Sequence, residues 1–173
     1  DVDLVRVDSV CGSELRILCS PDRAASVVDA LVDSGIPLVS AQAFALWRCS
    51  TLTPAEGYEL TGLCNPLESG AAKAVDFNKG CYIGQEVIGR LDSYDKVQRR
   101  LARVRWISEV TADIAPGTAI FSGEREAGFV TTHVFDPALD AWRGLACVRK
   151  AFAESEVELT CRIGDAEYGL VVE

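Results

Sequence analysis

The feature that most constrains the fold is a change in hydrophobic periodicity near position 95. Before it, apolar residues recur at helical spacing in at least one segment, at Ala24, Val27, Val28, Leu31 and Val32. After Lys96, Ala102, Val104 and Trp106 alternate with arginines, which is the pattern of a half-buried strand. We therefore expect a mixed α+β domain over residues 1–95 and a small all-β domain over residues 96–173.

The first domain is predicted to open with two strands, Val2–Val7 and Glu14–Cys19, around a turn at Cys11-Gly12-Ser13. A helix follows, because Ser20 can cap it, Pro21 suits its first position, and Gly35 with Pro37 ends it. The order of elements predicts a sheet with helices on one face.

Two further helices are expected in this domain. One runs from about Ser40 to Cys49 and ends before Thr53-Pro54, and the other runs from Cys81 to about Leu91 after Gly80. The buried stripe of the last helix would consist of Ile83, Val87, Ile88 and Leu91.

The second domain contains several short segments that alternate or are rich in β-branched residues. They are Gly128–Phe135, Gly144–Arg149, Val157–Ile163 and Tyr168–Val172, the last two joined at Gly164-Asp165. This pattern predicts a small antiparallel barrel or sandwich. His133 lies in one of these strands and is interpreted as a structural histidine with satisfied hydrogen bonds.

Composition narrows the class of protein. A hydrophobic content of 49% is sufficient for a packed core, yet no apolar run approaches the roughly 20 residues of a membrane span. The net charge of −9 argues against nucleic-acid binding, which needs clustered Lys and Arg. We expect a cytoplasmic protein, or one of the mitochondrial or plastid matrix if it is eukaryotic.

Seven cysteines occur at irregular spacings without a CxxC pair, and the chain has one histidine. This pattern indicates neither a disulfide framework nor a zinc site, so we predict no metal site and reduced, mostly buried thiols. Cys81 is the exception to consider, because it follows a glycine at the start of a predicted helix.

Cys81 could be either a reactive thiol or a small core residue. Helix N-terminal amides and a nearby cation, here Lys79, favour the thiolate, and Gly80 would let a ligand approach closely. Asp76 and Glu86 act in the opposite direction, since negative charge disfavours ionisation. The residues alone leave both alternatives open.

The octapeptide KGCYIGQE, Lys79 to Glu86, resembles the signature of the YgfZ/Iba57 family, folate-binding proteins of iron–sulfur cluster assembly that are related to the glycine-cleavage T-protein, an aminomethyltransferase. The preceding NPLESG, Asn65 to Gly70, and the later AGFVTTHVF are also similar to family segments. The resemblance covers most of the chain.

The resemblance implies a fold, in which part of a ferredoxin-like or T-protein-type α+β domain precedes a C-terminal antiparallel β-barrel. It implies that the chain is the latter half of a three-domain protein, without the N-terminal part that supplies much of the folate pocket.

The resemblance also implies site residues. Cys81 matches the motif cysteine, and its companions are Lys79, Gly80, Tyr82, Gly84, Gln85 and Glu86. Arg48 is a candidate contact to the folate cofactor, tetrahydrofolate or a derivative. Glu68 is a second candidate from its chemistry, since a carboxylate accepts hydrogen bonds from the adjacent donors of a pterin ring, and its alternative role is to cap a turn. In the segment around Arg48, Ser50 stands where the family has an acidic residue.

The implied function is that of a tetrahydrofolate-binding accessory protein in iron–sulfur cluster assembly or repair, with Cys81 at the rim of the folate pocket. Its partners would be folate and either assembly proteins or cluster-containing clients. An aminomethyltransferase that passes a one-carbon unit to tetrahydrofolate is the first alternative, and a non-catalytic interaction module is the second. The sequence does not decide whether the chain is an enzyme.

Overall fold

The computed structural model describes residues 2–9, 12–93, 96–154 and 156–173. The chain divides into two compact units, residues 1–44 and 45–173. The predicted domain boundary near Asp95 falls outside the described residues and stays a prediction.

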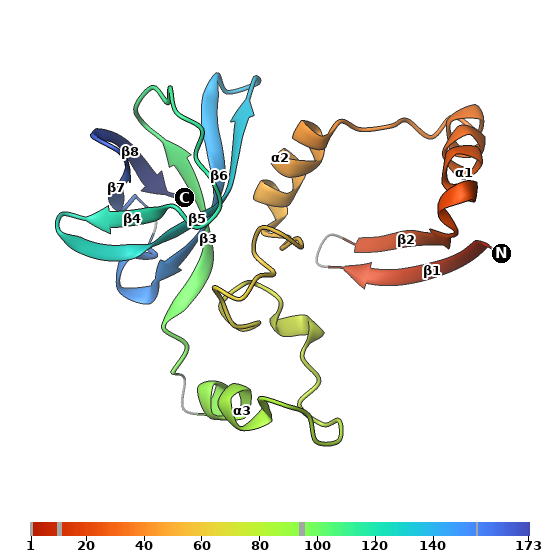
Figure 1. Cartoon of the computed structure of the whole chain (residues 1–173), viewed down its shortest axis with the longest axis horizontal. Helices are drawn as coiled ribbons and strands as arrows, with labels where there is room; N and C mark the ends of the chain where they lie inside the picture. Colours follow the sequence, from red (N-terminus) through yellow and green to blue (C-terminus); the bar gives the residue numbers. More distant parts are fainter. Residues whose placement is uncertain (1, 10–11, 94–95, 155) are drawn as a thin grey trace. The chain divides into compact units, whose positions relative to one another are not determined.

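The first unit begins with an antiparallel hairpin followed by a helix (Figure 1). Strands β1 (Val2–Ser9) and β2 (Gly12–Cys19) pair with Val2 opposite Cys19, and each is longer than predicted. Of the predicted turn Cys11-Gly12-Ser13, Cys11 lies outside the described residues, whereas Gly12 and Ser13 belong to β2 instead of the turn. Apolar residues of both strands, such as Leu4, Leu15 and Leu18, are exposed.

Helix α1 (Pro21–Asp33) has the predicted limits, with Pro21 at its first position. It ends because Gly35 adopts a φ of +88°, and the amides of Gly35 and Ile36 donate to the carbonyls of Val32 and Leu31. None of its residues is buried, so its apolar face carries no core contact among the described residues.

Helix α2 (Ala41–Thr51) confirms the second predicted helix, and the Ser40 hydroxyl accepts a hydrogen bond from the Ala43 amide at its start. Its C-terminal half belongs to the second unit. There Cys49 joins a buried apolar cluster with Leu101, Val134 and Leu145 of the barrel.

The second unit is dominated by a closed antiparallel barrel of six strands in the order β3-β6-β5-β4-β7-β8 (Figure 1). The strands are β3 (Arg99–Trp106), β4 (Ala119–Ser122), β5 (Arg125–Asp136), β6 (Ala141–Arg149), β7 (Glu158–Ile163) and β8 (Ala166–Val172). A short 3-10 turn, η2 (Lys150–Phe152), follows β6. The α+β class with a C-terminal barrel is confirmed.

The barrel interior is filled by alternate side chains of its strands, as the period-two pattern predicts. Ala102, Val104 and Trp106 of β3 belong to this core, together with Ala146 and Val148 of β6. Strand β4 was not predicted, because its four residues are too few to establish a period.

An irregular segment with few regular elements joins α2 to the barrel. It contains the turn η1 (Ala72–Ala74) and helix α3 (Gln85–Ser93). The prediction that this helix starts at Cys81 is wrong: Gly84 has a φ of +90°, outside the helical region, and the helix begins one residue later. The predicted buried stripe is also wrong, since Ile83 and Val87 are exposed and no residue of α3 is buried.

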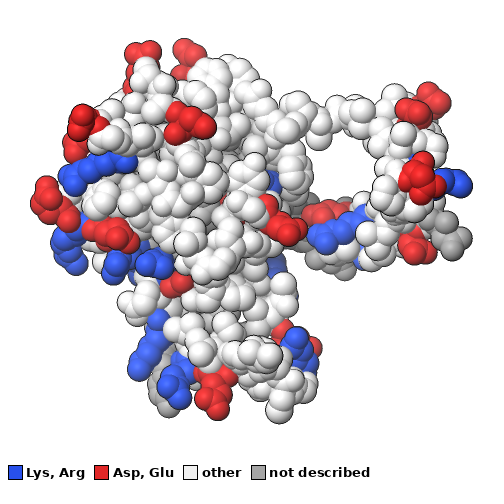
Figure 2. All heavy atoms as spheres, viewed as in Figure 1, with Lys and Arg blue, Asp and Glu red and all other residues white. Residues whose placement is uncertain are grey.

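Charged side chains of both signs are interspersed on the face that Figure 2 shows. Two arginines of β3 make polar contacts within the chain. Arg103 donates a hydrogen bond to the Ser50 carbonyl, and Arg105 forms an ion pair with Glu173 at 3.3 Å. Among the described residues, no helix has both the length and the apolar character that crossing a membrane requires.

Candidate functional site

The motif cysteine lies in an exposed loop ahead of α3. The thiol of Cys81 is accessible, which distinguishes it from Cys49, Cys147 and Cys161, all buried. The N-terminal amides of α3 lie four residues further along the chain, so the expected effect of a helix beginning at the thiol does not apply. The exposure of Cys81 contradicts the alternative of a small core residue, whereas the alternative of a reactive thiol stays a prediction.

The side chain of Lys79 contacts the Tyr82 ring. Its ammonium group lies over the Tyr82 ring, 4.7 Å from the centroid, which is the geometry of a cation–π contact. Tyr82 is half-buried, and Gly84 provides the turn into the helix. The motif is thus a short turn in which Cys81 is exposed and Lys79 contacts the motif's own aromatic residue.

An open depression of about 730 Å³ lies beside this turn. Its lining residues are Cys81, Tyr82, Gly84, Gln85, Glu86, Val87, Gly89 and Arg90. The depression therefore offers a thiol, an aromatic ring, an amide, a carboxylate and a guanidinium group within one segment. Among the described residues, no cluster of three or more His, Cys, Asp or Glu side chains is placed to hold a metal ion.

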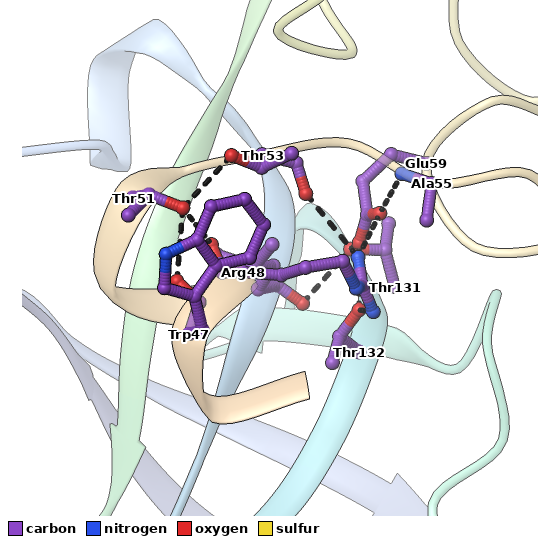
Figure 3. Close-up of polar contacts among 9 residues, drawn as sticks. Trp47, Arg48, Thr51, Thr53, Ala55, Glu59, Thr131 and Thr132 are labelled. Atoms are coloured by element: carbon purple, nitrogen blue, oxygen red, sulfur yellow. Dashed lines mark hydrogen bonds and ion pairs between the residues drawn. The ribbon is translucent and has the colours of Figure 1, made fainter. Parts of the chain in front are cut away.

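Arg48 lies elsewhere, in a buried network at the end of α2 (Figure 3). Its side chain is 2% exposed, and its Nη1 is 2.7 Å from Glu59 Oε2 in an ion pair. Its Nη2 donates to the Thr132 hydroxyl at 2.9 Å, and the guanidinium carbon lies 4.7 Å from the centroid of the Tyr58 ring.

The Glu59 carboxylate is the centre of this network. Thr131 and Thr132 donate to its Oε1 at 2.6 and 2.7 Å, and the Ala55 amide donates to its Oε2 at 3.0 Å. Figure 3 shows these groups converging from α2, the following loop and β5. Such complete partnering is what allows a charge pair to be buried.

Glu68 is also buried, at 7% exposed, and holds the loop against the barrel. Its Oε1 accepts a hydrogen bond from the Arg99 amide at the start of β3, at 3.2 Å. Asn65 shapes the same turn, because its side-chain oxygen accepts from the amides of Leu67 and Glu68.

Five of the predicted site residues line the depression together: Cys81, Tyr82, Gly84, Gln85 and Glu86. Arg48 and Glu68 are not among its lining residues. Contacts of Arg48 or Glu68 with folate stay predictions. Sequence reasoning did not identify Glu59, Thr131 or Thr132, although Thr131-Thr132 lies inside the segment AGFVTTHVF that resembles the family.

No protein-family model matches the chain. Among curated proteins, it is 31% identical over 170 residues to a chloroplastic protein of Arabidopsis thaliana provisionally named a transferase, covering 98% of this chain and 38% of that protein. It is 28% identical over 139 residues to the aminomethyltransferase of Geobacillus sp. (strain WCH70), covering 80% and 37%.

A third relative is the human mitochondrial iron–sulfur cluster assembly factor IBA57, which is 39% identical over 64 residues, 35% of this chain and 18% of that protein. Among solved structures, the glycine cleavage system aminomethyltransferase T from Bartonella henselae matches all of this chain with 48% of its own, at a TM-score of 0.73 and 20% identity. At that identity the match shows the fold.

The chain spans less than half the length of each of these proteins. The resemblance is nevertheless confirmed by relatives of both kinds: IBA57 matches 35% of this chain, and the Geobacillus aminomethyltransferase matches 80% of it. By sequence, the chain belongs among the relatives of the aminomethyltransferases and of the iron–sulfur cluster assembly factor IBA57, and it shares the aminomethyltransferase fold.

Proposed function

We propose that this chain is part of a folate-binding accessory protein for iron–sulfur cluster assembly or repair, in which Cys81 acts from an accessible loop. The observation that carries this proposal is the exposed Cys81 thiol at the edge of a depression lined by its own motif. The similarity to a human factor named for iron–sulfur cluster assembly supports it.

The depression suits part of a tetrahydrofolate molecule. A pterin ring presents adjacent N–H donors, which Glu86 and the Gln85 amide oxygen can accept, and the Tyr82 ring offers a stacking surface. Arg90 could pair with a carboxylate of the folate tail. Because the chain spans less than half of its relatives, these residues form one part of the proposed folate site.

One cysteine cannot supply the ligand set of a stable cluster or of a tetrahedral metal site. We therefore assign Cys81 a transient role, in thiol exchange or in passing a cluster to assembly proteins or client proteins. Its exposure permits such contact with a partner, which a core cysteine would not. By analogy with the chloroplastic and mitochondrial names of two relatives, the compartment is an organelle matrix or a bacterial cytoplasm.

The test is complementation by the full-length protein in a strain that lacks its own relative of the assembly factor. Cys81→Ala should lose complementation and lower the activity of cluster-containing enzymes, while Cys19→Ala, a half-buried thiol outside the motif, should preserve both. Normal growth and normal cluster-enzyme activity with Cys81→Ala would refute the role of the thiol.

Folate binding is measured separately, by titrating the full-length protein with tetrahydrofolate. Saturable binding that weakens in a Glu86→Gln or Arg90→Met variant is the expected result, since both side chains line the depression. Absence of saturable binding would favour the alternative, an interaction module that has the fold of its relatives but does not bind folate.

The second candidate function is aminomethyl transfer to tetrahydrofolate. Its support is the similarity to curated aminomethyltransferases and the shared fold. Folate-dependent ammonia release from an aminomethyl-loaded carrier protein distinguishes the two functions, and robust turnover would favour the enzyme.

A further inference from the structure

Two cysteines that are far apart in the sequence meet in the second unit. Cys64 lies in the loop after α2, and Cys147 lies on β6, which is paired on both sides by β3 and β5. Their sulfur atoms are 2.8 Å apart. A disulfide bond is about 2.05 Å long, so a movement of roughly 0.8 Å would bring the two sulfurs to bonding distance.

The environment makes the two thiols unequal. Cys147 is fully buried on the outer face of the barrel wall, the face that it shares with Leu145, and its backbone is fixed by neighbouring strands. Cys64 is half-buried in an irregular loop, so it is the more accessible of the two residues. Asn65 and Glu68 anchor that loop beside the pair.

The two thiols also differ in how readily they lose a proton. The pKa of Cys64 lies below its usual range, because a hydrogen bond from the Cys147 thiol stabilises its thiolate, although burial opposes this effect. The pKa of Cys147 lies far above its usual range, because of the same hydrogen bond and of burial. Because Cys64 is also the more accessible of the two, it is the sulfur that reacts first.

We propose that Cys64 and Cys147 form a reversible oxidation site, which a peroxide converts into a disulfide that fastens the loop to β6. The Cys64 thiolate attacks one peroxide oxygen, the O–O bond breaks, and water leaves after protonation, giving a sulfenic acid. The Cys147 sulfur then attacks the Cys64 sulfur, loses its proton, and displaces a second water. Two thiols and one hydrogen peroxide become one disulfide and two waters.

The site is separate from the motif cysteine and does not depend on the proposed function. Its consequence is local: the loop between α2 and η1, which carries Glu59 and Glu68, becomes covalently attached to the barrel. Cys49 and Cys161 are unsuitable competitors, because burial raises the pKa of each thiol to about 11.

The experiment treats the whole chain with hydrogen peroxide, alkylates the remaining thiols and digests it without reductant. Trypsin releases Cys147 in the peptide 144–149, and a glutamate-specific protease isolates Cys64 in the peptide 60–68, away from Cys49. A cross-linked pair of these two peptides, lost after dithiothreitol, is the expected product. The oxidised chain should also show a Tm higher by roughly 5 °C or more.

Matched variants make the result specific. Cys64→Ser and Cys147→Ser should each abolish the cross-linked pair and the rise in Tm, whereas Cys81→Ser, at an exposed thiol outside the pair, should keep both. The proposal is overturned if the wild-type chain, oxidised under these conditions, yields no such pair, whether Cys64 is unmodified, over-oxidised or joined to a different cysteine.

Discussion

At the scale of single residues, the buried ion pair of Arg48 and Glu59 connects three segments of the second unit (Figure 3). Arg48→Met would leave the Glu59 carboxylate buried without its cation, at a cost of about 3–5 kcal/mol. The free energy of unfolding, measured with urea, checks this value.

The control for this prediction is Arg149→Met, which removes a half-exposed pair with Glu126 at 4.0 Å and should cost less than about 1 kcal/mol. A double variant, Arg48→Met with Glu59→Leu, should be less destabilised than the sum of its single variants, since it removes both charges. Equal losses in Arg48→Met and Arg149→Met would contradict the assigned role of the buried pair.

We expect His133 to make the stability of the barrel depend on pH. Its ring stacks on Trp142 with centroids 4.2 Å apart and meets the edge of Trp106 at 4.6 Å. Its Nε2 is buried without a hydrogen-bond partner in the described part of the chain, so the expectation of a fully satisfied histidine is wrong. Burial lowers the pKa of His133 to about 4, while Asp113 acts in the opposite direction.

The sign follows from proton binding. Between pH 6.5 and about 4, the unfolded chain holds a proton on this histidine that the folded chain does not, so stability falls as pH falls through this window. His133→Phe keeps the ring stack and should flatten part of that fall. Urea midpoints of both proteins at about pH 7 and about pH 4.5 compare them. Parallel losses of stability in the two proteins would exclude His133 as the cause.

The residue-level site could be predicted only where its signal is local. The KGCYIGQE motif is contiguous, so Cys81 and its companions were identified from sequence. Arg48 pairs with Glu59, eleven positions on, and with Thr132, eighty-four positions on, and nothing in the local pattern pairs these residues. The contact of Cys64 with Cys147 is non-local in the same way.

At the scale of elements, β5 and β6 approach so closely at Gly144 that only glycine fits. A Cβ on Gly144 would lie 1.9 Å from the Thr132 carbonyl oxygen. This oxygen belongs to the backbone of the paired strand, so relieving the clash would require the strand itself to move. Gly144→Ala should therefore lower the free energy of unfolding by about 3 kcal/mol.

Gly62→Ala is the matched control, because a Cβ there meets nothing within 4 Å, and its effect should stay within about 0.5 kcal/mol. Circular dichroism during urea unfolding reports both variants. A Gly144→Ala protein as stable as Gly62→Ala would show that the two strands can separate at this point without loss.

The elements that sequence predicted well are those with strong end signals or long periods. Pro21 and Gly35 indicated the two ends of α1, and the alternation of apolar and polar residues predicted most of the barrel strands. The start of α3 was wrong because Gly84 takes a positive φ, which no hydrophobic pattern encodes. Its apolar residues follow a helical period although none is buried among the described residues.

At the scale of the whole molecule, the stability of the chain resides in its second unit. Both buried clusters are built from residues 49–172, whereas no residue of the first unit whose burial the structure describes is buried. The first unit therefore withdraws little apolar surface from water, and apolar burial is the main source of folding free energy.

Removing residues 1–39, which leaves Ser40 to cap α2, should change the free energy of unfolding by less than about 1 kcal/mol and preserve a single cooperative transition. Removing residues 166–173 instead deletes β8, which joins β7 to β3 and closes the barrel, and should abolish that transition. Urea unfolding followed by tryptophan fluorescence reports on the barrel in both cases, because Trp106 and Trp142 lie in or against its core. If the chain without residues 1–39 unfolded without cooperativity, the barrel would need contributions that its own two clusters do not supply.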